Sequence, residues 1–207
     1  MNKKLLIVLF IFSIAVFAAC DKKKAANKPA SAEPEVQKNA MPKPDDELAV
    51  IEMEEPAYGT IKIELYSNIA PKMVARFKEL SKEGFYNATS FHRINDSVIQ
   101  GGDPLSKDGN PANDGTGSSD KPNVEAEFSD IPYDTGIVGA ARSADFNSAN
   151  SQFFITLKRQ PGFDNKYTIF GKVVEGMNYV RTIAGAPKQG EHPLDDIKIK
   201  QITFEPR

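Results

Sequence analysis

The sequence has 207 residues, of which 40% are hydrophobic and 26% charged, and its formal net charge is −2. This composition is that of a folded domain with an additional segment, and a pI near 5.8 gives no basic face for nucleic acid. The single cysteine excludes an internal disulfide and a cysteine-rich zinc site, and two histidines are too few for a histidine metal cluster. We therefore expect no metal and no other cofactor.

Residues 1–19 have the pattern of a signal peptide. Residues 2–4 are Asn-Lys-Lys, and residues 5–19 are apolar apart from one serine, a stretch too short to span a bilayer comfortably. It ends in Phe-Ala-Ala followed by Cys20, which resembles a bacterial lipobox, where the cysteine is acylated (typically with palmitate) and becomes the first residue of the mature protein. A plain signal peptide cut before an incidental cysteine is the alternative.

Residues 20–47 are interpreted as the lipidated Cys20 followed by a flexible tether. Residues 21–47 contain four prolines, six lysines and no aromatic residue, so they offer too little apolar surface to offset the entropy of ordering them. We expect a spacer between a lipid bilayer and a domain formed by residues 48–207. The expected location is the bacterial cell envelope, with a monomeric domain outside the cytoplasm, on the periplasmic or surface side.

Residues 48–207 have the pattern of a mainly β domain. Residues 48–53 and 59–66 alternate apolar and polar side chains around a turn, which predicts a hairpin. Pro71 can begin a helix that ends near Gly84, and a second helix is expected over 176–183. Further strands are expected over 89–94, 97–100, 136–140, 152–157, 168–173 and 197–204. Many short strands without β–α alternation favour a barrel, and the polar stretch 102–123 is typical of a functional or mobile loop.

Three segments carry a resemblance to a known family. They are Phe-His-Arg-Ile at 91–94, Gln-Gly-Gly-Asp-Pro at 100–104 and Ser-Gln-Phe-Phe-Ile-Thr at 151–156. Their order and approximate spacing resemble those of the cyclophilins, with supporting matches at 163–173 and 174–177. The resemblance covers essentially all of 48–207. It implies a closed eight-stranded antiparallel β-barrel capped by two α-helices, and peptidyl-prolyl cis-trans isomerase activity on proline-containing unfolded or flexible polypeptides.

The resemblance also implies a role for individual residues. Arg93 matches the catalytic arginine, and Gln100 and Gln152 match two glutamines, of which one orients the arginine and one holds the substrate backbone. The remaining matches form the proline pocket and the segment that pairs with the substrate; they are Phe154 as the pocket floor, Val98, Phe163 and Tyr167 as walls, and Ala141 and Arg142 as the pairing segment. His92 is interpreted as structural, because the reaction transfers no proton.

One departure from the family pattern leaves a second function open. The stretch between Arg93 and Gln100 is one residue shorter than usual, and Ser97 falls where an aromatic residue normally closes the pocket. A lost aromatic wall removes apolar contact worth about 1–3 kcal/mol of proline binding, unless Phe163 reaches in. The chain is then either an isomerase for exported or envelope proteins, or a proline-peptide-binding or chaperone module with a weakened, non-catalytic pocket.

Overall fold

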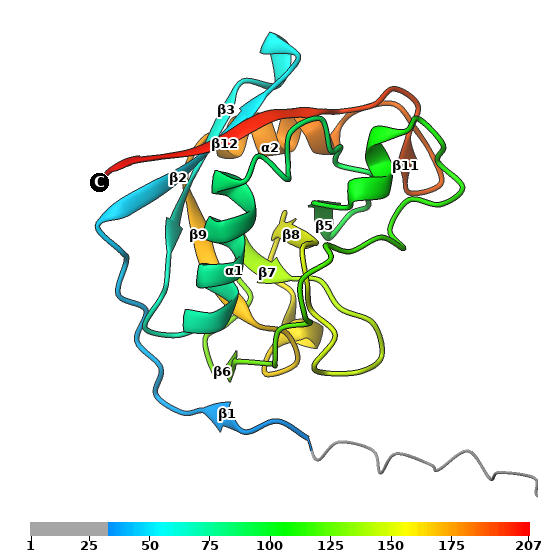
Figure 1. Cartoon of the computed structure of the whole chain (residues 1–207). Coiled ribbons are helices and arrows are strands. Elements are labelled where there is room, and N and C mark those ends of the chain that lie inside the picture. Colours follow the sequence, from blue (N-terminus) through cyan, green and yellow to red (C-terminus); the bar gives the residue numbers. More distant parts are fainter. Residues whose placement is uncertain (1–32) are drawn as a thin grey trace, which may run out of the picture. The chain divides into compact units, whose positions relative to one another are not determined.

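The structure, a computed structural model, describes residues 33–207 and contains one large antiparallel sheet flanked by two helices (Figure 1). The expected signal peptide at 1–19 and Cys20 lie outside the described residues. The α-helices are α1 (Pro71–Lys82) and α2 (Met177–Ala184). The strands are β1 (Val36–Gln37), β2 (Glu47–Met53), β3 (Thr60–Leu65), β4 (Arg93–Ile94), β5 (Val98–Gly101), β6 (Phe128–Ser129), β7 (Ile137–Ala140), β8 (Phe153–Thr156), β9 (Ile169–Glu175), β10 (Lys188–Gln189), β11 (His192–Pro193) and β12 (Ile199–Pro206).

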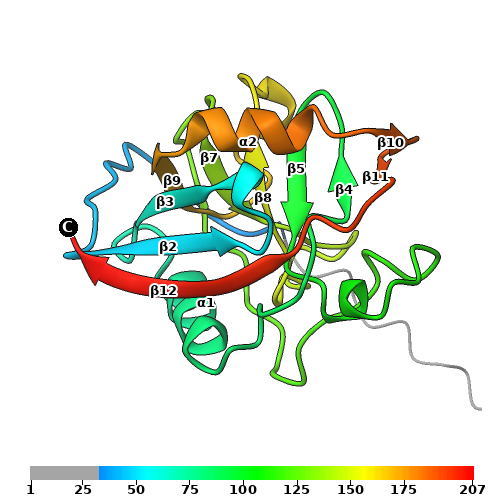
Figure 2. The same ribbon diagram turned by 90° about the horizontal axis from the view of Figure 1, so that it is seen from above.

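The expected hairpin and both expected helices are present. Strands β2 and β3 pair antiparallel, and in β3 the buried Ile61, Ile63 and Leu65 alternate with outward-facing polar residues. Helix α1 begins with a proline in its first turn and buries an apolar face against the sheet. In Figure 2, α1 and α2 lie on opposite sides of the curled sheet. Within residues 33–207 neither helix has the length and apolar character needed to cross a membrane.

The expected closed barrel was wrong: the eight-stranded sheet curls but remains open. Its strand order is β12-β2-β3-β9-β7-β8-β5-β4, and no ladder joins the end strands β4 and β12. Between them lie one isolated bridge, Ser90 to Lys198, and a few backbone hydrogen bonds such as Phe91 N–H to Ile197 O at 3.0 Å. The strand expected over 89–94 is reduced to β4, because residues 88–91 meet β12 only through that bridge and these few hydrogen bonds and form no continuous ladder.

The interior of the curled sheet is filled by aromatic rings from distant parts of the chain. Phe77 of α1 packs with ring centroids 5.4–5.6 Å from Tyr86, Phe153 and Phe170. All four rings are fully buried. A second, smaller apolar cluster lies on the other side of the sheet around Phe154, and this second cluster carries the candidate site.

Residues 33–46, here called the strap, lie against the domain, although the sequence assigned residues 20–47 to a flexible tether. Strand β1 pairs parallel with β6. The carboxylate of Asp130 accepts the backbone N–H groups of Asn39 (2.7 Å) and Ala40 (3.0 Å). The side-chain amide of Asn68 bonds the strap at Met41 O and Lys43 N. Polar side chains of the domain hold the strap in place, rather than burial of apolar side chains. The hydrophobicity pattern of residues 33–46 therefore could not predict that they pack against the domain.

Replacing Asp130 tests how the strap is held. In Asp130→Ala the amides of Asn39 and Ala40 lose their acceptor, so we expect faster hydrogen exchange at both in the full-length chain. Asp145→Ala is the control, because the Asp145 carboxylate also accepts a backbone N–H but lies in another loop. Unchanged protection at Asn39 and Ala40 would contradict the assignment.

The same contact predicts a pH dependence. The backbone N–H groups of Ala40 and Asn39 lower the pKa of Asp130 from its ordinary value of 3.8. Because the pKa is depressed in the folded state, the stabilisation is present above pH 3.8 and is lost as the pH falls through the lowered pKa. We therefore expect strap protection, measured by exchange at both amides, to persist at pH 4 and to fall only in more acidic solution.

Candidate active site

A row of side chains across three neighbouring strands forms the centre of the site. In the ladder register Arg93 of β4 lies opposite Gln100 of β5, and Gln100 lies opposite Phe154 of β8. Residues directly opposite each other in a sheet project to the same face. The register therefore brings a cation, an amide and an aromatic ring side by side, although the sequence separates the first and last by about sixty residues.

Phe154 forms the floor of a small aromatic pocket. The ring of Tyr133 stacks against Phe154 at 5.8 Å, and Phe163 and Tyr167 pack edge-on against it, each at 5.6 Å. The rings of Phe154, Phe163 and Tyr167 line a cavity of about 140 Å³, and Tyr133 lies buried outside it. Eight of the nine residues that the sequence assigned to catalysis and substrate binding line it; they are Arg93, Val98, Gln100, Ala141, Arg142, Phe154, Phe163 and Tyr167.

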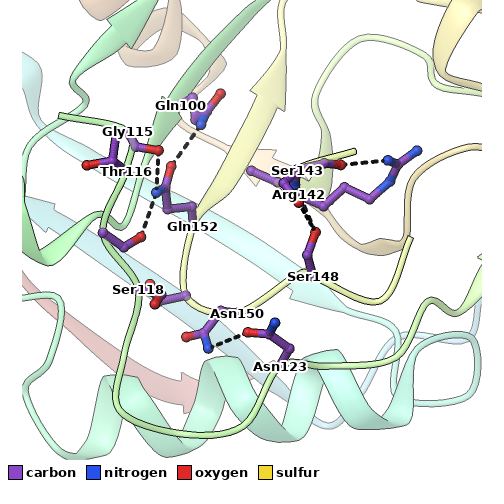
Figure 3. Close-up of a pocket in the computed structure, with 13 residues that line it drawn as sticks. Gln100, Gly115, Thr116, Ser118, Asn123, Arg142, Ser143, Ser148, Asn150 and Gln152 are labelled. Carbon is purple, nitrogen blue, oxygen red and sulfur yellow. Dashed lines mark hydrogen bonds between the residues drawn. The ribbon is translucent and has the colours of Figure 1, made fainter. Parts of the chain in front are cut away.

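The ninth residue, Gln152, links this cavity to a second one beside it. The cavity has a volume of about 300 Å³, and polar and small residues line it, including Gln100, Ala141, Arg142 and Gln152. Figure 3 shows the hydrogen bonds that join Gln152 to Gln100 and to the loop at Gly115. Gln100 Nε2 donates to Gln152 Oε1 at 2.9 Å, and Gln152 Nε2 donates to the carbonyls of Gly115 and Gly117.

The guanidinium of Arg93 belongs to the same chain of hydrogen bonds. Its Nη1 donates to Gln100 Oε1 at 3.2 Å, and its Nε donates to Glu191 Oε2 at 2.5 Å. The hydrogen bond from Arg93 lowers the pKa of Glu191, which keeps this carboxylate ionised at neutral pH. A continuous path of polar contacts therefore runs from Glu191 through Arg93 to the loop around Gly115.

The long polar stretch 102–123 forms one wall of the site. The carboxylate of Asp103, fully buried, accepts the backbone N–H groups of Leu105, Gly115 and Gly117. This one side chain therefore folds the loop back on itself and presents two of its carbonyls to Gln152. The expectation of a functional loop agrees with its position at the cavity.

Arg142 is oriented by aromatic rings. Its guanidinium carbon lies 4.6 Å from the ring centre of Tyr167 and 4.9 Å from that of Phe146, and its Nε and Nη2 both donate to Lys166 O. Such cation–π contacts fix the tilt of Tyr167 at the pocket wall. The Ala141 N–H, which belongs to the expected pairing segment, is already bonded to Gln152 O at 3.0 Å.

The shortened segment before Gln100 leaves the pocket with an aromatic wall. Ser97 lies outside the aromatic cavity, and the side-chain oxygen of Asn95 accepts the N–H groups of Ser97 and Val98 in a tight turn. Phe163 occupies the wall, 5.1 Å from the ring of Tyr167. The pocket therefore keeps aromatic contact around its floor without an aromatic side chain at position 97.

His92 lies beneath the site and is 5% exposed, with no hydrogen-bond partner on either ring nitrogen within residues 33–207. Burial lowers its pKa, so the ring is neutral at physiological pH. The structural interpretation of His92 stays a prediction. Among the same residues, no group of three or more His, Cys, Asp or Glu side chains is arranged to hold a metal ion.

Sequence reasoning missed three residues of the site: Tyr133, Gly139 and Glu191. Tyr133 and Gly139 are both in contact with Phe154, and Glu191 contacts Arg93. None belongs to a segment that carries the family resemblance. Glu191 could not be found from local spacing, because 98 positions separate it from Arg93.

The family profile described as "Cyclophilin type peptidyl-prolyl cis-trans isomerase/CLD" matches residues 49–204. The chain belongs to the cyclophilin family. It is 45% identical over 153 residues to a probable peptidyl-prolyl cis-trans isomerase of Brucella suis, a match covering 71% of this chain and 78% of the relative. It is also 41% identical over 146 residues to the peptidyl-prolyl cis-trans isomerase cypE of Dictyostelium discoideum, covering 70% and 91%.

A solved structure is similar over the same domain. The cyclophilin type peptidyl-prolyl cis-trans isomerase of Cryptosporidium parvum, crystallised in the presence of the dipeptide Ala-Pro, superposes with a TM-score of 0.69. It is 31% identical and covers 77% of this chain and 99% of the parasite chain. The expected cyclophilin relationship and isomerase activity are thus confirmed, and the chain is a cyclophilin-type peptidyl-prolyl isomerase.

Gly139 of β7, which lies against the ring of Phe154, allows a test of whether this aromatic cavity of the cyclophilin binds proline. A Cβ on Gly139 would lie 2.4 Å from Phe154 Cζ and 2.8 Å from the Tyr133 hydroxyl. Gly139→Ala must therefore displace the floor ring. We expect overpacking to cost about 1–3 kcal/mol of stability and calorimetry to show weaker binding of an Ala-Pro peptide.

Gly162→Ala is the matched control, because nothing lies within 4 Å of the Cβ it would add. This variant should keep both its melting temperature and its peptide affinity. If Gly139→Ala bound the peptide as tightly as the wild type does, Phe154 would not be the floor of the proline site.

Proposed function

We propose that the aromatic cavity holds the proline ring of an X-Pro peptide and that Arg93 lowers the barrier to rotation of its amide bond. The observation that carries this proposal is the row formed by Arg93, Gln100 and Phe154 across β4, β5 and β8. It joins an apolar surface for the proline ring to a fixed cation at the rim of the same cavity.

The chemistry requires no nucleophile. Amide resonance opposes rotation with a barrier of about 18–20 kcal/mol, and no covalent bond breaks during the turn. In the twisted state the proline nitrogen becomes pyramidal and its lone pair becomes more basic. A donor held near that nitrogen binds the twisted state more tightly than either planar state. Arginine suits this role, because its guanidinium is planar and does not lose its charge.

The two glutamines are proposed to serve the flanking backbone. Gln100 accepts from Arg93 and donates to Gln152, so it both orients the arginine and fixes the second glutamine. Gln152 lines the polar cavity and is bonded to Gln100, which lines both cavities. We infer that residues next to the proline occupy the polar cavity, while Ala141 and Arg142 border both cavities.

We further propose that the protein is a lipoprotein of the bacterial envelope and acts as a monomer on exported or envelope proteins. The support is the apolar stretch 5–19 followed by small residues and Cys20, together with the absence of any other cysteine in the chain. The proposed substrates are proline-containing unfolded or flexible polypeptides, for which uncatalysed isomerisation takes tens of seconds or longer.

Arg93→Ala tests the electrostatic role. Loss of the fixed donor should reduce kcat/KM by at least about tenfold while the proline pocket remains, because removing one transition-state donor from an oxyanion hole costs about 10²–10³ in kcat. The measurement is exchange NMR of cis-trans interconversion in a short Ala-Pro peptide, with the full-length chain in catalytic amounts. Arg181→Ala, on the exposed surface of α2, is the control and should retain full activity.

Equal rates for the wild type and Arg93→Ala would refute the proposed role of Arg93. Binding of the peptide by the wild type without any acceleration would instead support the proline-binding or chaperone module.

Cys20→Ser tests the lipid anchor. In bacteria grown with labelled palmitate, the wild-type chain should carry the label and yield an acylated N-terminal Cys20 by mass spectrometry. The variant lacks the thiol that is acylated and should carry no label. A wild-type mature chain with an unmodified Cys20 would show that residues 1–19 are an ordinary signal peptide.

A further inference from the structure

The contact of Arg93 with Gln100 alone is not enough to fix the orientation of its guanidinium. It stands on β4, a strand of only two residues at the end of the sheet, and 46% of its side chain is exposed. One hydrogen bond of 3.2 Å, from Nη1 to Gln100, ties it to the floor. A long side chain with a single such contact retains many rotamers, yet transition-state stabilisation requires a fixed donor.

Glu191 supplies three contacts at this edge. Its Oε2 accepts Arg93 Nε at 2.5 Å, and its Oε1 accepts Asn95 Nδ2 at 2.9 Å. Its backbone carbonyl accepts the N–H of Ile94 at 2.6 Å. The main chain and the side chain of Glu191 therefore hold both the strand and the guanidinium that the strand carries.

The hairpin that carries Glu191 is itself fixed. Strands β10 and β11 pair antiparallel, and Gly190 makes the turn between them with a φ of 63°. Next to the turn, His192 Nδ1 hydrogen-bonds to the carbonyl of His92 at 3.0 Å. Figure 2 shows this hairpin beside β4. Glu191 is thus placed by a paired turn bonded to the chain beside Arg93.

We propose that Glu191 is a positioning residue for the isomerase reaction and acts through Arg93. With Nε held by Glu191 and Nη1 by Gln100, the plane of the guanidinium is fixed. Nη2, which has no hydrogen-bond partner among residues 33–207, is then left for the twisted amide. This inference rests on the proposed role of Arg93.

A purely stabilising ion pair is the competing explanation. The Glu191 side chain is 50% exposed, and pairs exposed to this degree contribute little to folding stability, because water and salt screen them. The melting temperature therefore separates the two roles. A positioning residue changes the catalytic rate while leaving the melting temperature nearly unchanged.

The experiment compares Glu191→Ala and Glu191→Gln with the wild type, all as full-length chains. Exchange NMR on the Ala-Pro peptide should show kcat/KM lowered by about tenfold in Glu191→Ala, since misplacing a catalytic group by an ångström can cost more than this. Glu191→Gln keeps an acceptor without the charge and should fall between the two. Calorimetry should give an unchanged peptide dissociation constant, so that the loss lies in kcat.

Glu205→Ala and Glu205→Gln are the matched controls. Glu205 is likewise half-exposed (43%) and pairs with Lys62 at 2.9 Å, but it lies on β12, outside both cavities. These variants make the same change of charge and should leave kcat/KM unchanged.

A double-mutant cycle completes the test. In an Arg93→Ala background, Glu191→Ala should have no further effect on the rate, because the group it positions is gone. An equal loss in both backgrounds, or an unchanged rate in Glu191→Ala, would overturn the inference. A faster Glu191→Ala would also overturn it, since the carboxylate would then be weakening the charge of Arg93. If Arg93→Ala were fully active, the proposed role of Arg93 would fail as well.

Discussion

The alternation of side chains along β8 is the constraint on which the fold and the site both depend. Phe153 projects into the interior, where it packs edge-on against Phe77, Tyr86 and Phe91. Phe154, the next residue, projects to the opposite face and forms the floor of the aromatic cavity. Because successive residues of a strand point to opposite faces, one dipeptide fixes β8 in the core and supplies the binding surface. A slip of one residue in this strand would exchange the two faces and destroy both.

The reactive part of the site is held by a chain of polar side chains rather than by burial. Side-chain hydrogen bonds of 2.5–3.2 Å join the neighbouring pair Arg93 and Gln100 to Glu191 and Gln152, which lie 98 and 52 positions further along the chain. The aromatic pocket is preformed by packing, whereas the guanidinium is oriented by directional contacts at a solvent-exposed edge. If the proposed roles hold, affinity for proline and acceleration of its rotation depend on different parts of the molecule, and each can be altered separately.

Much of this architecture could be predicted because its signals are local. Alternation in 48–53 and 59–66, the proline that begins α1 and the three family segments all lie within short windows, and the structure has the corresponding elements. The closed barrel was wrong because closure depends on how residues 88–91 meet β12, where the structure has one isolated bridge and a few backbone hydrogen bonds instead of a ladder. The strap and Glu191 gave no signal, because their contacts are polar and join residues 25 to 98 positions apart. Hydrophobicity patterns in a sequence predict which side chains are buried. The strap and Glu191 are held by polar contacts instead of burial, so such patterns do not reveal them.

The hairpin formed by β10 and β11 also protects the edge strand β4 from pairing with other chains. The final strand of an open sheet presents unpaired N–H and C=O groups, which can template pairing with any extended chain. On β4 the Ile94 N–H is taken by the Glu191 carbonyl, and just before β4 the Phe91 N–H is taken by Ile197. Neither of these N–H groups is therefore free to pair with an extended chain that could add to this edge as an extra strand. If the aromatic cavity holds proline as proposed, a substrate is bound through one ring, a contact that ends when the ring leaves, rather than through a growing ladder of strands that leads to aggregation.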